Sequence, residues 1–165
     1  MIGLTPLGTM HTAISLVAVG AGFIALARDG AISPINRLGK LYICATVATC
    51  LTAFGIFQHG GFGKPHVLGI LTLIVLAIAA LARRSGIFGG ASPYVETVSY
   101  SATFLFNLIP GVTESATRLP PGGPLAASAD APGLQAAAGV LLVLFAVVAV
   151  VQVRRLRSSR LRSSA

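Results

Sequence analysis

The chain has 165 residues, of which 55% are hydrophobic and only 10% are charged, and its mean hydropathy is +0.86. Soluble globular domains are about one quarter charged, so a soluble domain is excluded, and the high apolar content also excludes a disordered chain. Twelve Lys and Arg against four Asp and Glu give a net charge of +8. These cations flank apolar segments, which indicates membrane topology and argues against nucleic acid as a partner. The chain is therefore predicted to be an all-α, polytopic membrane protein.

Five segments are long and apolar enough to cross a bilayer, whose hydrocarbon core requires about 20 helical residues. In chain order they are, approximately, residues 7–27, 41–58, 66–82, 93–109 and 134–153. They are predicted to form one transmembrane bundle that occupies the whole chain as a single domain. The fourth span contains Glu96, about one turn from the predicted cytoplasmic surface. Three alternatives are open for this carboxyl group: it is protonated, it serves proton transfer, or it pairs with Arg83 or Arg84 or extends to the surface, and the last is favoured.

Two segments outside the spans differ from short connecting turns. Residues 110–133 are rich in proline and glycine and include the cluster Pro-Pro-Gly-Gly-Pro, so they predict a loop without regular structure. Residues 154–165 carry five arginines and form a basic tail. A tail of this kind fixes the orientation of the protein and binds anionic lipid.

The basic residues predict which way the chain enters the membrane. Lys64 and Arg118 fall on one side of the five spans, and the other ten fall on the opposite side: Arg28, Arg37, Lys40, Arg83, Arg84, Arg154, Arg155, Arg157, Arg160 and Arg162. Cytoplasmic loops carry an excess of Lys and Arg. We therefore expect a periplasmic N-terminus and a cytoplasmic C-terminus in the inner membrane of a bacterium.

The polar residues best suited to bind a metal ion or a cofactor lie on the predicted periplasmic side. His11, His59 and His66 all belong to that side, and imidazoles that converge from several helices can ligate a metal ion or a haem iron. Asn107, Glu114 and Arg118 fall at the same level. Together these residues predict a site for one haem b, a metal ion or a quinone. The alternative is that the histidines only cap helix ends and that Glu114 and Arg118 form a local ion pair.

The sequence carries no catalytic motif such as a nucleophile elbow, a zinc-protease helix or a phosphate-binding loop, so a binding role is favoured over an enzymatic one. The first hypothesis is a redox-associated protein that binds a cofactor or quinone near the periplasmic face. The alternative is a non-enzymatic accessory or scaffold subunit of a larger membrane complex, which the small size and the many small residues in the spans favour.

The segment Ile35-Asn36-Arg37-Leu38-Gly39-Lys40-Leu41-Tyr42, together with His11 and His66-Val67-Leu68, resembles a family of predicted bacterial membrane proteins that is catalogued as a domain of unknown function. The similarity covers roughly residues 11–70. Asn36 stands where the family carries a histidine. The resemblance implies a helical membrane fold and a bacterial origin, and it implies no particular activity.

Overall fold

The computed structural model describes residues 5–56, 61–118, 124–126 and 128–163. Within these residues all regular secondary structure is helical and no strand is present, which confirms that the chain is all-α. There are five α-helices and one short 3-10 helix: α1 (Pro6–Asp29), α2 (Arg37–Ala53), α3 (Lys64–Arg84), η1 (Gly89–Ala91), α4 (Ser92–Arg118) and α5 (Pro132–Ser163).

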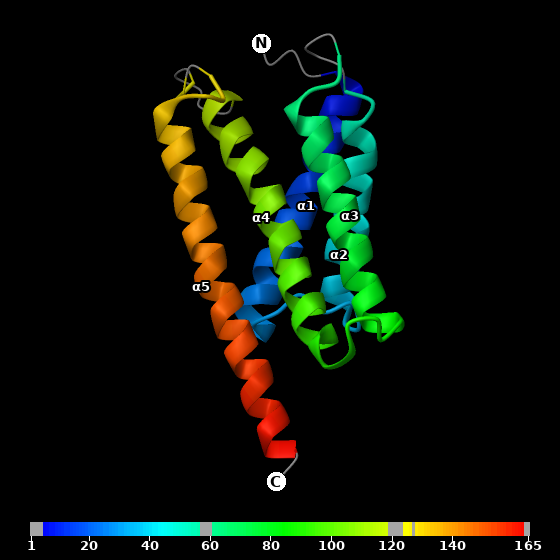
Figure 1. Ribbon diagram of the computed structural model, residues 1–165. Coiled ribbons are helices and arrows are strands. Elements are labelled where there is room, and N and C mark those ends of the chain that lie inside the picture. Colours follow the sequence, from blue (N-terminus) through cyan, green and yellow to red (C-terminus); the bar gives the residue numbers. More distant parts are fainter. Residues whose placement is uncertain (1–4, 57–60, 119–123, 127, 164–165) are drawn as a thin grey trace.

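The five helices run alternately in opposite directions along a common axis (Figure 1). Helices α1, α3 and α5 begin at the end drawn at the top of Figure 1, which we call the upper end, and α2 and α4 begin at the lower end. Helix α1 packs mainly on α2, α3 packs mainly on α4, and α5 packs mainly on the outer side of α4. The last turns of α5 project beyond the other helices at the lower end.

Local sequence explains where the first two helices begin and end. The side chain of Thr5 caps α1 by accepting a hydrogen bond from the backbone N–H of Gly8 at 3.1 Å, and Pro6 occupies the first helical position. Helix α1 ends at Asp29. Its C-cap residue, Gly30, has a φ of +72°, a left-handed backbone conformation that glycine adopts readily.

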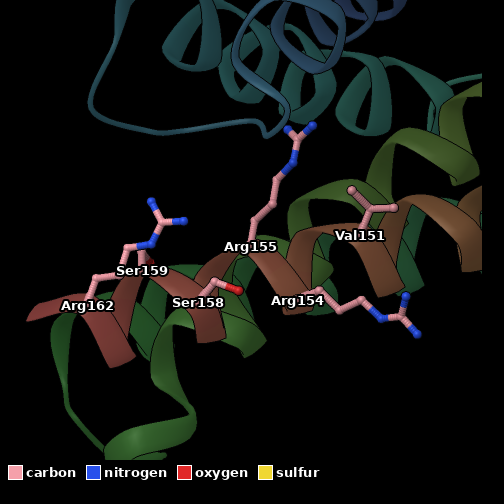
Figure 2. Close-up of a pocket in the computed structure, with 6 residues that line it drawn as sticks. All are labelled: Val151, Arg154, Arg155, Ser158, Ser159 and Arg162. Carbon is pink, nitrogen blue, oxygen red and sulfur yellow. The ribbon is translucent and has the colours of Figure 1, made fainter. Parts of the chain in front are cut away.

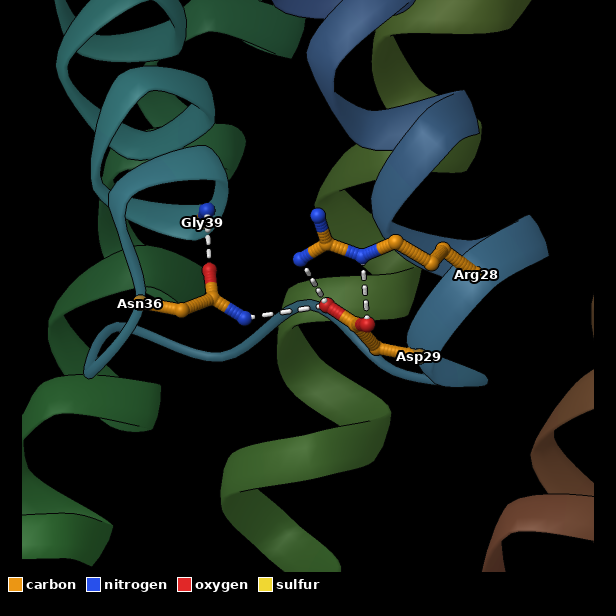
Figure 3. Close-up of polar contacts among 4 residues, drawn as sticks. All are labelled: Arg28, Asp29, Asn36 and Gly39. Carbon is orange, nitrogen blue, oxygen red and sulfur yellow. Dashed lines mark hydrogen bonds and ion pairs between the residues drawn. The ribbon is translucent and has the colours of Figure 1, made fainter.

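Asn36 holds the connection between α1 and α2 in place (Figure 3). Its Oδ1 accepts a hydrogen bond from the N–H of Gly39 at 2.7 Å and so caps α2. Its Nδ2 donates to Oδ2 of Asp29 at 3.0 Å, while Arg28 donates to both carboxylate oxygens of Asp29. Asn36 therefore ties the first turn of α2 to the last residue of α1.

Small residues allow α1 to approach α2 and α4 closely. Ala18, Ala21 and Ala25 are buried along one side of α1. Gly22 lies so close to its neighbours that an added Cβ would be 2.5 Å from Cδ2 of Phe104 and 2.9 Å from Cδ2 of Tyr42. Packing of this kind is the main source of helix association in lipid.

Three of the five helices are long and apolar enough to cross a membrane: α1, α3 and α5. In the most apolar window of α5 only 6% of the residues are buried, against 33% in α3, so α5 presents apolar side chains on almost every side. Such a surface suits contact with lipid or with another apolar helix. The predicted count of five spans and the predicted orientation stay predictions.

Helix α4 continues beyond the boundary expected from the sequence. The irregular loop was predicted to begin at Pro110, but the helix runs through Pro110 to Arg118. Proline removes one backbone hydrogen bond. Threonine side chains supply others in this stretch, because Thr113 donates to the carbonyl of Ile109 at 2.9 Å and Thr117 donates to that of Thr113 at 2.8 Å.

Candidate functional site

His11 lies near the upper end of α1 and is held by α2. Its Nδ1 is 2.9 Å from Oγ1 of Thr52, and the Thr52 hydroxyl also lies 2.9 Å from the carbonyl oxygen of Ala48 and 3.0 Å from that of Thr49. Which atom donates in the contact between His11 and Thr52 depends on the tautomer of His11. In the arrangement in which Thr52 donates to a carbonyl of α2, Nδ1 of neutral His11 carries the ring proton and Nε2 is an acceptor.

Glu114 reaches the same region from α4. Its carboxylate is near enough to the His11 ring for a Coulombic attraction, although the residue itself is exposed. Thr49 adds a buried hydroxyl that makes no hydrogen bond with any of the described residues. We refer to His11, Thr49, Thr52 and Glu114 as the upper polar site. It joins three helices at one end of the bundle.

His66 has a different role from His11. It is buried in the first turn of α3, and its Nδ1 accepts a hydrogen bond from the N–H of Gly63 at 3.2 Å. Its ring stacks on Phe62 and Phe54, with centroid distances of 5.3 and 6.5 Å. This arrangement matches the alternative in which a histidine caps the start of its helix.

The predicted centre of three histidines has no counterpart among the residues that the structure describes, where no three His, Cys, Asp or Glu side chains gather as metal ligands do. His59 lies outside the described residues, and so does the side chain of Arg118. The ligand role of the histidine trio and the ion pair of Glu114 with Arg118 therefore stay predictions.

Asn107 belongs to a buried network in the middle of the bundle. Its Nδ2 donates to Oγ1 of Thr46 at 3.0 Å and to the hydroxyl of Tyr42 at 3.4 Å, and Tyr42 is 2.8 Å from Oγ1 of Thr103. We call these four residues the interhelical ladder, because each helix contributes two side chains four positions apart. Asn107 lies seven residues before Glu114, or about 10 Å along α4. It is thus separated from the upper polar site.

Sequence reasoning missed Tyr42, Thr46 and Thr103 as partners of Asn107. The pattern that reveals them is a pair of polar residues four apart on each of two apolar helices, which places both pairs on single helix faces.

The lower end of the bundle carries cationic side chains and one further ion pair. Arg83 donates to Oε1 of Glu96 at 3.0 Å, which matches the favoured one of the three alternatives for Glu96. On α5, Gln152 is buried, accepts a hydrogen bond from Ser101 at 3.0 Å and donates to the carbonyl of Gly30 at 2.8 Å. These contacts fix the inner part of α5 against α4 and the end of α1.

An open hollow of about 490 Å³ lies beside this junction. Its lining residues come from the last third of α5: Val151, Arg154, Arg155, Ser158, Ser159 and Arg162. Figure 2 shows Arg155 pointing from α5 toward the connection between α1 and α2. We refer to this feature as the basic hollow.

Comparison of the chain with known protein families, with characterised proteins and with solved structures finds no significant match. The resemblance to a family of predicted bacterial membrane proteins therefore stays a prediction.

Proposed function

We propose that the chain is an integral protein of the bacterial inner membrane, with five spans, a periplasmic N-terminus and a cytoplasmic C-terminus. The alternating helix directions support five crossings, because each connection then lies at one membrane surface (Figure 1). The charges support the orientation. Lys64 begins α3 and Arg118 ends α4 at the upper end, whereas the other ten basic residues belong to the lower end or to its connections.

Within this topology, the upper polar site lies near the periplasmic face and binds the headgroup of a quinone, which gives the protein a redox-associated binding role. The observation that carries this proposal is the contact of His11 Nδ1 with Oγ1 of Thr52 at 2.9 Å. In the tautomer that carries its proton on Nδ1, Nε2 accepts a hydrogen bond from the hydroxyl of a reduced quinone. Burial disfavours a charged ring and the nearby carboxylate of Glu114 opposes this effect only in part, so the proposal uses the neutral imidazole as an acceptor.

A quinone suits this site better than a metal ion does. Protein sites for zinc and similar metals use three or four ligands, and the described residues do not gather three. A quinone headgroup needs only a few hydrogen bonds inside an apolar surround, and the partly exposed His11 ring can supply one of them.

The test is binding of a short-chain radiolabelled quinol to the purified full chain in lipid nanodiscs. His11→Ala should weaken binding by about tenfold, the value of one hydrogen bond of about 1.4 kcal/mol. Ser115→Ala, next to Glu114 on the exposed side of α4, should bind as the wild type does. A wild-type protein that binds no quinol, or a His11→Ala variant of unchanged affinity, contradicts the proposal.

The same preparation tests the haem and metal alternatives. A Soret band after reconstitution with haem b that disappears in His11→Ala would favour a haem. A stoichiometric metal ion that is lost in both His11→Ala and His66→Ala would favour a metal. Either result would replace the quinone as the ligand.

A second candidate function is that of an accessory or scaffold subunit in a larger membrane complex. The exposed apolar surface of α5 supports it, because only 6% of the residues in its apolar window are buried within the chain. Extraction in mild detergent followed by native sizing tests this candidate. An assembly that contains other proteins supports the candidate, and a monomer contradicts it.

A further inference from the structure

The lining of the basic hollow includes three arginines, Arg154, Arg155 and Arg162, and two serines. Arg155 points toward the connection between α1 and α2 and lies beside the end of α1, since a Cβ added to Gly30 would be 2.5 Å from Nη1 of Arg155. Ser159 donates its proton to the carbonyl of Leu156 at 2.9 Å, so it has no proton to donate to an anion and the arginines are the donors of the hollow. Arginine presents several donors in a fixed planar geometry that matches phosphate oxygens.

The positive charge of the hollow is not balanced by the protein's own carboxylates. The chain has four acidic residues, and each is engaged away from the hollow. Asp29 pairs with Arg28, Glu96 with Arg83, and Asp130 with Lys64, while Glu114 lies near His11 at the upper end: these contacts involve no hollow residue. An external anion is therefore the natural counter-charge.

The residues that precede the hollow on α5 indicate that this anion belongs to a lipid. Val143, Val147 and Val151 follow one another at intervals of four on α5, and Arg155 continues the same row. Their exposed fractions are 63%, 56% and 41%. A row of exposed valines that ends at an arginine fits an acyl chain with its phosphate group at the membrane surface.

We infer that the basic hollow is a specific site for the phosphate group of an anionic phospholipid, whose acyl chain lies along Val143, Val147 and Val151. The inference deepens the proposed topology, because it rests on α5 crossing the membrane with its arginines at the cytoplasmic surface. It does not depend on the upper polar site. It also differs from diffuse attraction to a basic tail, because it assigns the binding to particular arginines.

The test titrates the purified full chain in neutral detergent with short-chain phosphatidylglycerol, with phosphatidylcholine of the same chain length and with inorganic phosphate. Arg155→Gln and Arg154→Gln should each weaken binding of phosphatidylglycerol about tenfold, the effect of losing one hydrogen bond to a charged group of about 1.5 kcal/mol. The matched control is Arg157→Gln, which removes the same charge from an exposed position outside the hollow and should change the affinity less than twofold, because it makes no hydrogen bond to the phosphate and its distant attraction is screened by salt.

Arg154→Gln is included because Arg155 contacts Gly30 and its loss could disturb the fold, which circular dichroism monitors for each variant. Equal weakening by all three substitutions would mean diffuse charge attraction and would overturn the site while leaving the topology intact. Phosphatidylcholine binding as tightly as phosphatidylglycerol would overturn the role of the charge. Inorganic phosphate binding as tightly as the lipid would overturn the assignment to a lipid. None of these outcomes bears on quinone binding at the upper end.

Discussion

The hydroxyl oxygen of Tyr42 on α2 lies 2.8 Å from Oγ1 of Thr103 on α4, and both side chains are completely enclosed by the bundle. Thr103 also donates to the carbonyl of Tyr100 at 2.8 Å, so Tyr42 is the donor to Thr103. Asn107 in turn donates to Tyr42, which makes the tyrosine hydroxyl both donor and acceptor. This relationship fixes how far α2 and α4 are shifted along each other.

Tyr42→Phe removes the central hydroxyl of the interhelical ladder. We expect the free energy of unfolding to fall by about 0.6 to 1.7 kcal/mol, the range measured for hydrogen bonds between membrane helices. Thermal or denaturant unfolding in detergent measures the change. Tyr94→Phe is the control, because the ring of Tyr94 lies under Arg160 at 5.2 Å and its hydroxyl is outside the ladder. An equal fall in the free energy of unfolding of both variants would contradict a stabilising role for the hydroxyl of Tyr42 in the interhelical ladder.

Gly22→Ala tests the close approach of α1. The added methyl group would overlap Phe104 and Tyr42, so we expect a loss of stability of about 1 to 3 kcal/mol. Gly20→Ala, two residues earlier on the exposed side of the same helix, meets nothing within 4 Å and should gain about 0.5 to 1 kcal/mol from better helix propensity. The same unfolding measurement compares the two variants, and a neutral Gly22→Ala would show that the packing is looser than described.

Gln152→Leu tests the attachment of α5. It removes the hydrogen bonds to Ser101 and Gly30 and leaves the buried hydroxyl of Ser101 and the partly buried carbonyl of Gly30 without that partner, which should cost about 1 to 3 kcal/mol. Val150→Ala, on an exposed part of the same turn, should cost less than about 0.5 kcal/mol. A double variant with Ser101→Ala should lose less than the sum of the single losses, since the two residues share one hydrogen bond. Additive losses would show that they act independently.

Single cysteines test the proposed topology. In a background with Cys44→Ala and Cys50→Ala, Ser128→Cys should react with a membrane-impermeant maleimide in intact cells, because residue 128 is exposed near the upper end. Ser85→Cys, which is exposed at the end of α3, should react only after the membrane is permeabilised. The reverse labelling pattern would invert the orientation, and labelling of both in intact cells would contradict five spans.

The helical fold could be predicted because hydropathy and charge act over whole segments. The apolar runs of α1, α3 and α5 exceed the length that a bilayer requires, and no tertiary information is needed to see it. The pairing of Glu96 was also predictable, since an acid one turn from a membrane surface has few partners within reach other than Arg83 and Arg84.

The site was harder to predict, because it depends on which faces of the helices meet. His11 and Thr52 are 41 residues apart, and nothing in either segment specifies that Nδ1 meets that hydroxyl. Asn107 was expected beside the histidines, but its rotation around α4 directs it toward Tyr42 and Thr46. The end of α4 was also unpredictable from composition. Pro110 predicts a helix end in isolation, yet α4 runs through it, and Thr113 and Thr117 add side-chain hydrogen bonds to the carbonyls of the following turns.

Helix α5 runs without interruption from Pro132 to Ser163, about 48 Å, which exceeds the thickness of the hydrocarbon layer by more than half. Near the lower end of the bundle Arg160 donates to the carbonyl of Gly90, in the turn that joins α3 to α4. A change in the tilt of α5 would therefore be transmitted to this turn, so one rigid helix couples the connection where α5 begins to the connection at the opposite end of the bundle.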